Sequence, residues 1–501
     1  MTRPAGEGLR YAVSRMSPVW VTFAASIALS VIAIRTGGTL NRDGMLYIDA
    51  AKAFLQSGWP AAREIFAWPF FPVLIATVSS VTGLGPETSG HLLNVLFMAG
   101  ACAFLIASAS RLFPEAVWPT ILVLLALPGL NDYRSELIRE YGCWFFLTMS
   151  LWLSLKWDER PRWITAMATQ CSLLAAALFR PEALAFYPAL ILWQLASAPR
   201  QERVRRLAMI GLAPMLGLGI LGLLFLTGKL ESVRLAAEFQ RISLVRFNAK
   251  AEILSSGLID YAKDQARTIL LFGSLALIPV KFLKKLGLFV IPLLFLVFRG
   301  ADFREALKRS KALAWFVVMD ILVLMVFVTD MQFIAGRYMA LLLLLSTPIT
   351  GYGLWLLMQR MPRGTHVVIG LTVLLMINNV VTLQPAGERF RAAGKWLAAH
   401  AEDSPRVYIE SARSAYYAGW KFSGRPTHSN RTAMESGIAE GRYELVAIEA
   451  SASDPQLQEW LDRVGLREIT RFEEAKRREM VLIAEPVRKK HQDSDSKTLR
   501  N

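Results

Sequence analysis

The residues that could do chemistry first appear in the stretch "TLNRDGMLYIDAAKAF" (39–54), directly after the first long apolar run. It contains Arg42, Asp43 and Tyr47. Because a charged side chain taken into hydrocarbon costs several kcal/mol, polar residues this close to a bilayer lie at its surface or in a water-filled cavity. A carboxylate there could accept a proton from a hydroxyl group as a general base. An Asp before Gly is also a common turn residue, so Asp43 has both a catalytic and a structural interpretation.

A second group of charges lies in "NDYRSELIREYG" (131–142), between two apolar runs. It contains Arg134, Glu136 and Glu140. On a helix, the i, i+4 spacing would place the two glutamates on one face. One interpretation is a second carboxylate facing the same cavity as Asp43. The other is a solvated helix start with acids that cap its first turn.

Two arginines follow in short turns beside apolar runs. The motif "FRPEA" contains Arg180 and Glu182, and the motif "AGRYM" contains Arg337 and Tyr338. The planar guanidinium fork matches the oxygens of a phosphate group. The alternative is that these arginines reach out to lipid headgroups along apolar surface. A lipid phosphate would suit either arginine as a partner.

The elements that must position these residues are membrane-length helices. Hydrophobic residues make up 54% of the 501 residues. The apolar runs cover about 17–34, 67–83, 89–108, 115–130, 139–156, 162–179, 183–197, 206–228, 268–298, 312–329, 338–358 and 366–383. They predict an α-helical polytopic membrane protein with about 11–13 transmembrane helices. The first run follows three arginines and reads as an uncleaved helix rather than a signal peptide.

Loop charges predict the orientation of these helices. The basic loops are 156–162, 200–206, 303–311 and 359–364, which the positive-inside bias assigns to the cytoplasm together with the N-terminus. The first loop (36–66), the segment 229–267 and the tail then lie outside. Two points conflict with this scheme. The path from loop 36–66 to loop 156–162 needs one extra crossing, which a break near Pro128 and Gly129 could supply. The run 268–298 must cross once although it contains "KFLKK".

The predicted domains are a transmembrane catalytic domain (1–383), a soluble extracytoplasmic α/β domain (384–487) and a disordered tail (488–501). In the second domain "RVYIES", "ELVAIEA" and "REMVLIAEP" have strand character, and "DPQLQEWLDRVG" has helical spacing closed by a glycine. This alternation predicts a small α/β fold. Neither GxGxxG nor a P-loop opens a helix there, so no nucleotide chemistry is assigned.

Composition excludes other classes. The net charge of +16 could suggest nucleic acid, but the basic residues cluster beside apolar runs and no basic-plus-aromatic module occurs. The three cysteines lie in apolar runs without a CxxC pair, and no HExxH motif occurs. The sequence therefore requires no metal or other cofactor. Carboxylates near a phosphate could still hold a divalent cation.

The layout resembles the GT-C superfamily of membrane glycosyltransferases, in the branch with the aminoarabinose transferase of lipid A and the protein O-mannosyltransferases. The resemblance lies in Asp43 soon after the first helix with Tyr47 close behind. It continues in "FAWPFFPVLIA", in "ALPGLNDYRSELIREYGCWFFL" and in "AGRYMALLLLLSTPITGYGLWLL". It implies a polyprenyl-phosphate sugar donor and Asp43 as the base that deprotonates the acceptor hydroxyl. It also implies that Glu136 or Glu140 is a second shared acid and that Arg337 meets the donor phosphate.

Two positions depart from that pattern. Mannosyltransferase-type members often have Asp where Glu136 or Glu140 stands. The aminoarabinose branch has a lysine before the second helix in a Lys-Pro context, where this chain has Trp68 before Pro69. Arg63 could replace that contact with the donor phosphate. Because of these departures, the sequence does not name the sugar.

The functional hypothesis is transfer of one sugar to a lipid, glycan or protein acceptor at the external face of the inner membrane. Single displacement would invert the anomeric carbon, and Arg337 with Arg180 or Arg134 would stabilise the leaving phosphate. A second hypothesis is a transporter or flippase for a lipid-linked or anionic solute, which predicts internal repeats that the sequence does not show. A third is a structural or assembly subunit, in which Asp43 would be dispensable.

Overall fold

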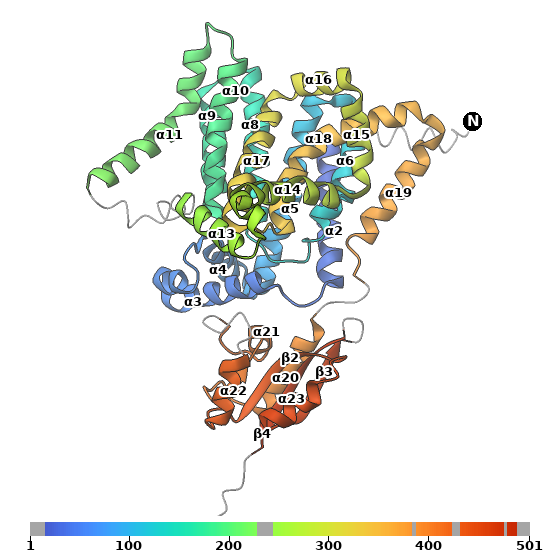
Figure 1. Ribbon diagram of the computed structural model, residues 1–501. Coiled ribbons are helices and arrows are strands. Elements are labelled where there is room, and N and C mark those ends of the chain that lie inside the picture. The colour runs from blue at the N-terminus through green and yellow to red at the C-terminus, as the bar shows by residue number, and fades with distance from the viewer. Residues whose placement is uncertain (1–15, 228–243, 383–386, 423–430, 475–477, 488–501) are drawn as a thin grey trace, which may run out of the picture. The chain divides into compact units, whose positions relative to one another are not determined.

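The chain divides into two compact units in the computed structural model (Figure 1). The helical unit comprises Met1–Thr36 and Glu87–Thr382, and the mixed unit comprises Gly37–Pro86 and Leu383–Asn501. The structure describes residues 16–227, 244–382, 387–422, 431–474 and 478–487. The predicted disordered tail 488–501 and part of the predicted external segment 229–267 lie outside these residues. Each unit is considered by itself below.

The helical unit consists of helices that follow the apolar runs of the sequence. They are α2 (Pro18–Thr36), α5 (Pro86–Leu112), η1 (Pro114–Ala116), α6 (Val117–Ala126), α7 (Pro128–Asn131), α8 (Glu140–Glu159), α9 (Trp163–Phe179), η2 (Pro181–Ala185), α10 (Phe186–Ser197), α11 (Arg203–Leu226), α13 (Leu244–Ser256), η4 (Asp260–Gln265), α14 (Ala266–Leu286), η5 (Gly287–Phe289), α15 (Val290–Phe298), α16 (Gly300–Arg309), α17 (Lys311–Met331), α18 (Gly336–Arg360), η6 (Pro362–Gly364) and α19 (Thr365–Asn378). Within the described ranges, the helices α2, α5, α17 and α18 are long and apolar enough to cross a membrane. We therefore treat this unit as membrane-spanning.

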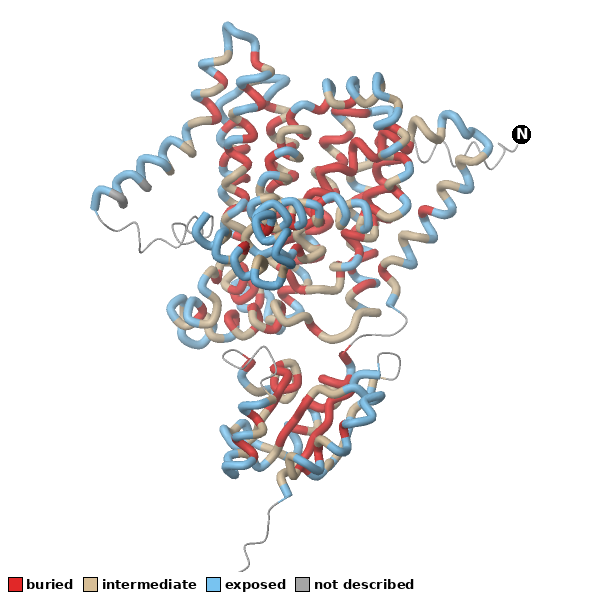
Figure 2. Tube along the Cα trace, viewed as in Figure 1, coloured by how far each residue is buried: buried red, intermediate tan, exposed pale blue. Residues whose placement is uncertain are grey.

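The core of the helical unit centres on α18. Its residues 339–354 are all buried, which fits a helix that is apolar on every side. Gly351 and Gly353 allow close neighbours, because a Cβ atom at either position would collide with Thr120 of α6 or with the backbone of Pro292 in α15. Small residues at such crossings are typical of membrane helix packing. Figure 2 shows the contrast between this buried helix and the largely exposed α11 and α19.

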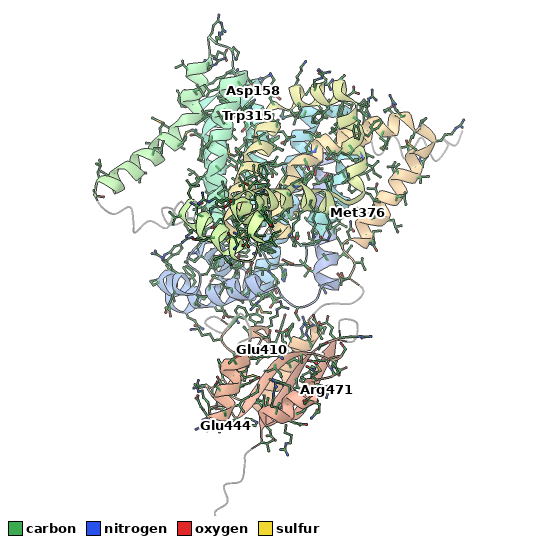
Figure 3. The ribbon with its side chains drawn as sticks, viewed as in Figure 1. Asp158, Trp315, Met376, Glu410, Glu444 and Arg471 are labelled. Atoms are coloured by element: carbon green, nitrogen blue, oxygen red, sulfur yellow. The ribbon has the colours of Figure 1, made fainter. Side chains whose placement is uncertain are left out.

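Ion pairs gather the predicted cytoplasmic loops at one end of the helical unit. Arg206 at the start of α11 pairs with Asp158 at the end of α8, with 2.7 Å between Nη1 and Oδ1. Arg111 at the end of α5 pairs with Glu159, also at 2.7 Å. Figure 3 shows Asp158 near the same end of the unit as Trp315, in the first turns of α17. The loops 156–162 and 200–206 therefore share this end, here called the basic end.

The other two basic loops lie at the basic end as well. Arg309 at the end of α16 pairs with Glu115 of η1, directly after α5, at 2.8 Å. The guanidinium of Arg360, at the end of α18, lies 5.8 Å from the ring centre of Phe295 in α15, the helix that leads into α16. The grouping of all four loops is the one that the charge pattern predicted.

The chain between α5 and α8 runs three times between the two ends of the helical unit. Near the start of α5, the Asn94 amide donates to the carbonyl of Glu136, whereas Arg111 lies at the basic end. The chain then returns through α6 and α7 and goes back through α8, which gives three passes. The helix α4 (Phe70–Thr82) has 13 residues and is about 20 Å long, which is short for hydrocarbon ~30 Å thick. The break at Pro128 adds no crossing, because α7 continues the return of α6, and the orientation of the first loop stays a prediction.

The second conflict is resolved by a break in the run 268–298. The helix α14 carries "KFLKK" in its last turns, and there Lys285 pairs with Asp132 at 2.6 Å while Lys281 donates to the carbonyl of Ile334. These partners lie in the turns that precede α8 and α18, away from the basic end. The chain then turns at Gly287, whose φ of 60° suits glycine, and α15 leads back to α16. The run 268–298 therefore forms two helices, α14 and α15, separated by this turn.

The mixed unit joins two helices of the first loop to a small α/β fold. Its elements are α3 (Arg42–Ile65), α4, α20 (Glu388–His400), β1 (Val407–Ile409), α21 (Ala412–Tyr417), α22 (Arg431–Ala439), β2 (Leu445–Ser451), α23 (Leu457–Val464), β3 (Leu466–Glu474) and β4 (Glu479–Pro486). The sheet order is β1-β2-β4-β3, with β1 parallel to β2 and the other pairs antiparallel. The three predicted strands and the predicted helix, closed by Gly465 at a φ of 73°, are confirmed.

Candidate functional site

A pocket in the helical unit collects charged residues from four separate stretches of sequence. Its walls come from α8, η2, α10, α17 and α18. The lining residues are Glu140, Cys143, Trp144, Leu147, Arg180, Glu182, Ala183, Phe186, Asp320, Val323, Leu324, Phe327, Arg337, Tyr338 and Leu341. The centre of a water-sized sphere can move through about 60 Å³ of this space. Since one water needs ~10–15 Å³ on that measure, the space is large enough for several waters or for part of a ligand.

The centre of the pocket is an ion-pair cluster around Arg180. Its Nη1 donates to Oε1 of Glu140 at 2.9 Å, and its Nη2 and Nε donate to the two carboxylate oxygens of Glu182 at 2.8 and 3.4 Å. The side chains of Arg180 and Glu140 are 13% and 4% exposed. Because all three guanidinium nitrogens are engaged, Arg180 serves first to hold the carboxylates in place. It ties the start of α8 to the turn after α9.

Glu182 stays ionised because of this pairing. Partial burial raises the pKa of its carboxyl, but the charge and hydrogen bonds of Arg180 outweigh burial and bring the pKa to about 2. A lowered pKa stabilises the folded state at pH values above the ordinary pKa of 4.5. This stabilisation is lost as the pH falls toward 2. The Arg180–Glu182 contact therefore persists across the physiological pH range.

Arg337 is more exposed than Arg180. Its Nε lies 3.6 Å from Oε1 of Glu140, and its side chain is 26% exposed. The neighbouring Tyr338 ring lies between the two arginines, 4.6 Å from the Arg180 guanidinium and 5.4 Å from that of Arg337. A guanidinium that lines the pocket and is partly accessible can present its planar fork to an entering anion.

The pocket lies at the opposite end of the helical unit from the basic loops. The 20 residues of α8 span about 30 Å, with Glu140 in the first turn and Asp158 in the last. Likewise α17 and α18 meet at the turn before Gly336, whereas Trp315 and Arg360 lie toward the basic end. Gly336 is required there, because a Cβ atom would collide with the hydroxyl of Tyr133.

Arg134 is not part of the pocket lining. It is 2% exposed, and its Nη1 donates to the carbonyl and hydroxyl of Ser26 and to the hydroxyl of Ser30 at 2.8–3.1 Å. Its Nε donates to the side chain of Asn131 at 2.6 Å. The structure thus places this predicted phosphate ligand as a buried link between α2 and the turn before α8. Its predicted part in binding stays a prediction.

Glu136 lies outside the pocket lining too. Residues 132–139 form turns, and α8 begins only at Glu140, so the two glutamates do not share a helix face as the spacing suggested. The reason is local, because Asn131 at the end of α7 and the following Asp132 and Ser135 favour turns over helix. The backbone of Glu136 accepts the hydrogen bond from Asn94 described above.

The first-loop candidates belong to the mixed unit, at the start of α3. Asp43 lies in the first turn of α3, where its charge complements the helix dipole, and it is half-buried. Tyr47 is 4% exposed and packs edge-on against Phe66 and Phe71 with ring centres 5.2 and 5.5 Å away. Tyr47 is therefore a core residue of its unit, and its predicted contact with substrate stays a prediction.

Arg42 lies close to other cations of the mixed unit. Burial lowers the pKa of Arg413, the carboxylate of Glu449 raises it, and the charges of Arg42 and Arg389 lower it further. Arg389 is anchored by carboxylates, with Nη2 2.6 Å from Glu479, whereas Arg42 begins α3 beside Asp43.

Comparisons with known proteins add one finding. A scan against protein-family models and a search of the curated proteins find no match. A search of the solved structures finds the crystal structure of ArnT from Cupriavidus metallidurans in the apo state. The TM-score is 0.43 and the identity 13%, over 94% of this chain and 98% of that chain. Because the TM-score lies below 0.5, function is argued below from the residues of this chain.

The start of α3 is fastened to the C-terminal part of the mixed unit. The backbone N–H of Leu40 donates to the hydroxyl of Tyr417 at 2.8 Å, and the N–H of Phe422 donates to Oδ2 of Asp49 at 2.9 Å. The ammonium of Lys52 lies 5.7 Å from the ring centre of Tyr416. Tyr417 of α21 therefore fixes the chain just before α3, and Phe422 in the loop after α21 fixes the second turn of α3.

Removing the Tyr417 hydroxyl is expected to loosen the chain next to Asp43. The variant Tyr417→Phe leaves the N–H of Leu40 without this acceptor, a loss of about 0.5–1.5 kcal/mol. We expect faster hydrogen–deuterium exchange in a peptide covering residues 38–48, with little change in the transmembrane peptides. Tyr261→Phe, at a residue that is 92% exposed, is the matched control. Exchange at wild-type rates in Tyr417→Phe would contradict the contact.

Loss of an acceptor for Arg134 is expected to lower the stability of the helical unit. Ser30→Ala removes one hydrogen bond to a buried guanidinium, which corresponds to about 1.5–3 kcal/mol. The measurement is thermal unfolding in detergent. Ser108→Ala is the control, because the Ser108 hydroxyl is also buried but bonds only to Phe104 in its own helix. Equal unfolding temperatures for the two variants would contradict the role of Arg134 as a link.

One charged residue of the pocket was not predicted from the sequence. Glu140, Arg180, Glu182, Arg337 and Tyr338 were predicted, whereas Asp320 was not. Asp320 lies within α17 and is 4% exposed. The sequence does mark Asp320, because it is the one carboxylate inside the apolar run 312–329. Ionisable residues within a membrane helix usually face the protein interior or a cavity. Among the described residues no group of three His, Cys, Asp or Glu side chains is placed to hold a metal ion.

Proposed function

We propose that the protein is an integral-membrane glycosyltransferase that moves one sugar from a polyprenyl-phosphate-linked donor to a lipid, glycan or protein acceptor. The observation that carries the proposal is the pocket, where Arg180, Glu140 and Arg337 meet at the end of the helical unit opposite the basic loops. The positive-inside bias then assigns the pocket to the external side of the inner membrane. A lipid-linked donor can reach such a pocket from the bilayer.

In this proposal Arg337 binds the donor phosphate. Its side chain lines the pocket and is 26% exposed, whereas that of Arg180 is 13% exposed and bonds to Glu140 and Glu182 through all three nitrogens. Arg180 acts as the positioning residue that fixes Glu140 and, through it, the resting position of Arg337. A fixed cation placed where charge develops stabilises a transition state better than water does.

The chemical step is a single displacement. The Asp43 carboxylate accepts the proton of the acceptor hydroxyl, and the hydroxyl oxygen forms a bond to the anomeric carbon. The bond between that carbon and the phosphate oxygen breaks, and its electron pair leaves with the polyprenyl phosphate, whose negative charge Arg337 stabilises. Asp43 then returns its proton to water. Attack from the face opposite the leaving group inverts the anomeric carbon.

The test uses the full chain purified in lipid with a panel of radiolabelled polyprenyl-phosphate hexoses and pentoses. Release of polyprenyl phosphate from one donor, together with inverted anomeric configuration in the product, is the expected result. Absence of release from every donor, combined with transbilayer movement of one of them in vesicles, would refute the proposal in favour of a flippase.

A further inference from the structure

The pocket contains a buried acid that the proposed chemistry does not use. Asp320 is 4% exposed, and its Oδ2 has no hydrogen-bond partner among the described residues. Leaving a carboxylate oxygen buried without a donor is costly, and more so within a membrane helix. A packing role does not require this side chain, because Leu or Met would fill the same volume of an apolar helix without that cost. The unpaired Oδ2 of Asp320 therefore indicates that a bound ligand supplies the hydrogen-bond donor.

A second oxygen of the same kind lines the pocket. Oε1 of Glu140 receives Arg180 and Arg337, but Oε2 is buried without a hydrogen-bond partner in the described part of the chain. The side chain of Glu140 is 4% exposed. Glu140 of α8 and Asp320 of α17 thus line the same pocket, and each has one carboxylate oxygen without a hydrogen-bond donor among the described residues. That pair of acceptors fits a ligand with several hydrogen-bond donors.

The rest of the lining narrows the class of ligand. Aromatic rings from the four helices α8, α10, α17 and α18 line the same pocket, namely Trp144, Phe186, Phe327 and Tyr338. Sugar rings combine hydroxyl groups at their rim with apolar C–H faces. Carboxylates that accept from the hydroxyls and rings that cover the C–H face are the matching protein groups.

We propose that this pocket binds the sugar ring of the donor, and that Asp320 accepts a hydrogen bond from one of its hydroxyl groups and so determines which sugar is used. Glu140 accepts a second hydroxyl through Oε2 while Oε1 keeps its contacts with the arginines. The inference rests on the proposed function and deepens it, because it names the part of the donor that the pocket recognises. A site built to bond a hydroxyl rejects the analogue that lacks it, since its own acceptor is then left unpaired.

The test compares wild type, Asp320→Leu and Asp320→Asn with the accepted donor and its monodeoxy analogues. In wild type, removal of one particular hydroxyl is expected to lower kcat/KM by about 10–100-fold, as for a hydrogen bond to a charged group. Asp320→Leu is expected to lose a similar factor with the intact donor and to show no further loss with that deoxy donor. Asp320→Asn keeps an acceptor oxygen and is expected to fall between the two.

The controls separate this inference from the proposed function. Asp330→Asn, in the last turn of the same helix and paired with Lys250 at 3.5 Å, lies outside the pocket lining and is expected to discriminate donors as wild type does. If wild type releases polyprenyl phosphate from no donor, the proposed function fails. If wild type is active but Asp320→Leu discriminates every deoxy donor as wild type does, only this inference is overturned. Should Asp320→Leu not fold, unchanged discrimination by Asp320→Asn overturns it instead.

Discussion

Asp43→Asn is expected to lower kcat for sugar transfer by about 10²–10⁴-fold, the range that a general base contributes. The amide keeps the size of the side chain but cannot accept the proton of the acceptor hydroxyl. Asp43 lies in the first turn of α3, so the substitution also removes a favourable contact with the helix dipole, at a cost of about 0.3–1 kcal/mol. That cost is too small to unfold the unit. The measurement is single-turnover release of polyprenyl phosphate with saturating donor and acceptor.

The matched control for this change is Asp260→Asn. Asp260 begins a short 3-10 helix in the helical unit, and its side chain is 88% exposed beside Lys263. It is expected to retain wild-type kcat. An Asp43→Asn variant that folds like wild type and transfers sugar at the wild-type rate would remove Asp43 from the chemistry and favour the flippase or the assembly subunit.

The sequence predicted the helices well because membrane spans leave a strong signal. A run of ~20 apolar residues in hydrocarbon forms a helix, because a helix satisfies its own backbone hydrogen bonds. The helices α17 and α18 were therefore evident from composition alone. The run 268–298 was harder, because a turn at one glycine, Gly287, separates α14 from α15 without interrupting the apolar pattern. The strand β3 was missed, although its residues alternate between exposed and half-buried, because charged residues dominate "LREITRFEE".

The candidate site was predictable where a charged residue lies in a short turn between apolar runs. Arg180, Glu182 and Arg337 carry that signal, and the structure brings them together in one pocket. Arg134 also lies in a short turn between apolar runs, but its side chain bonds to Ser26 and Ser30 of α2. The tertiary fold decides which side of a turn faces the cavity, and the local sequence does not show it. Asp320 lies within a helix, where periodicity does not show which face is inside when every neighbour is apolar.

Arg337→Gln is expected to lower kcat/KM by about 10²–10³-fold, because it removes the cation that stabilises the leaving phosphate. Arg337→Lys keeps the charge but loses the planar fork, so an intermediate loss is expected. The stability of the unit should change little, since Glu140 retains its 2.9 Å contact with Arg180. Arg304→Gln, on α16 near the basic end, is the matched control and is expected to be fully active.

Arg180→Gln separates a binding role from a structural one in the same pocket. It leaves the buried carboxylate of Glu140 without its closest cation, and breaking such a pair typically costs about 3–5 kcal/mol. We therefore expect a much lower unfolding temperature for Arg180→Gln and a near-normal one for Arg337→Gln, although both lose activity. If Arg337→Gln were instead destabilised as strongly as Arg180→Gln while the folded fraction kept its wild-type kcat/KM, Arg337 would be a structural ion-pair partner. The phosphate contact would then have to come from another cation.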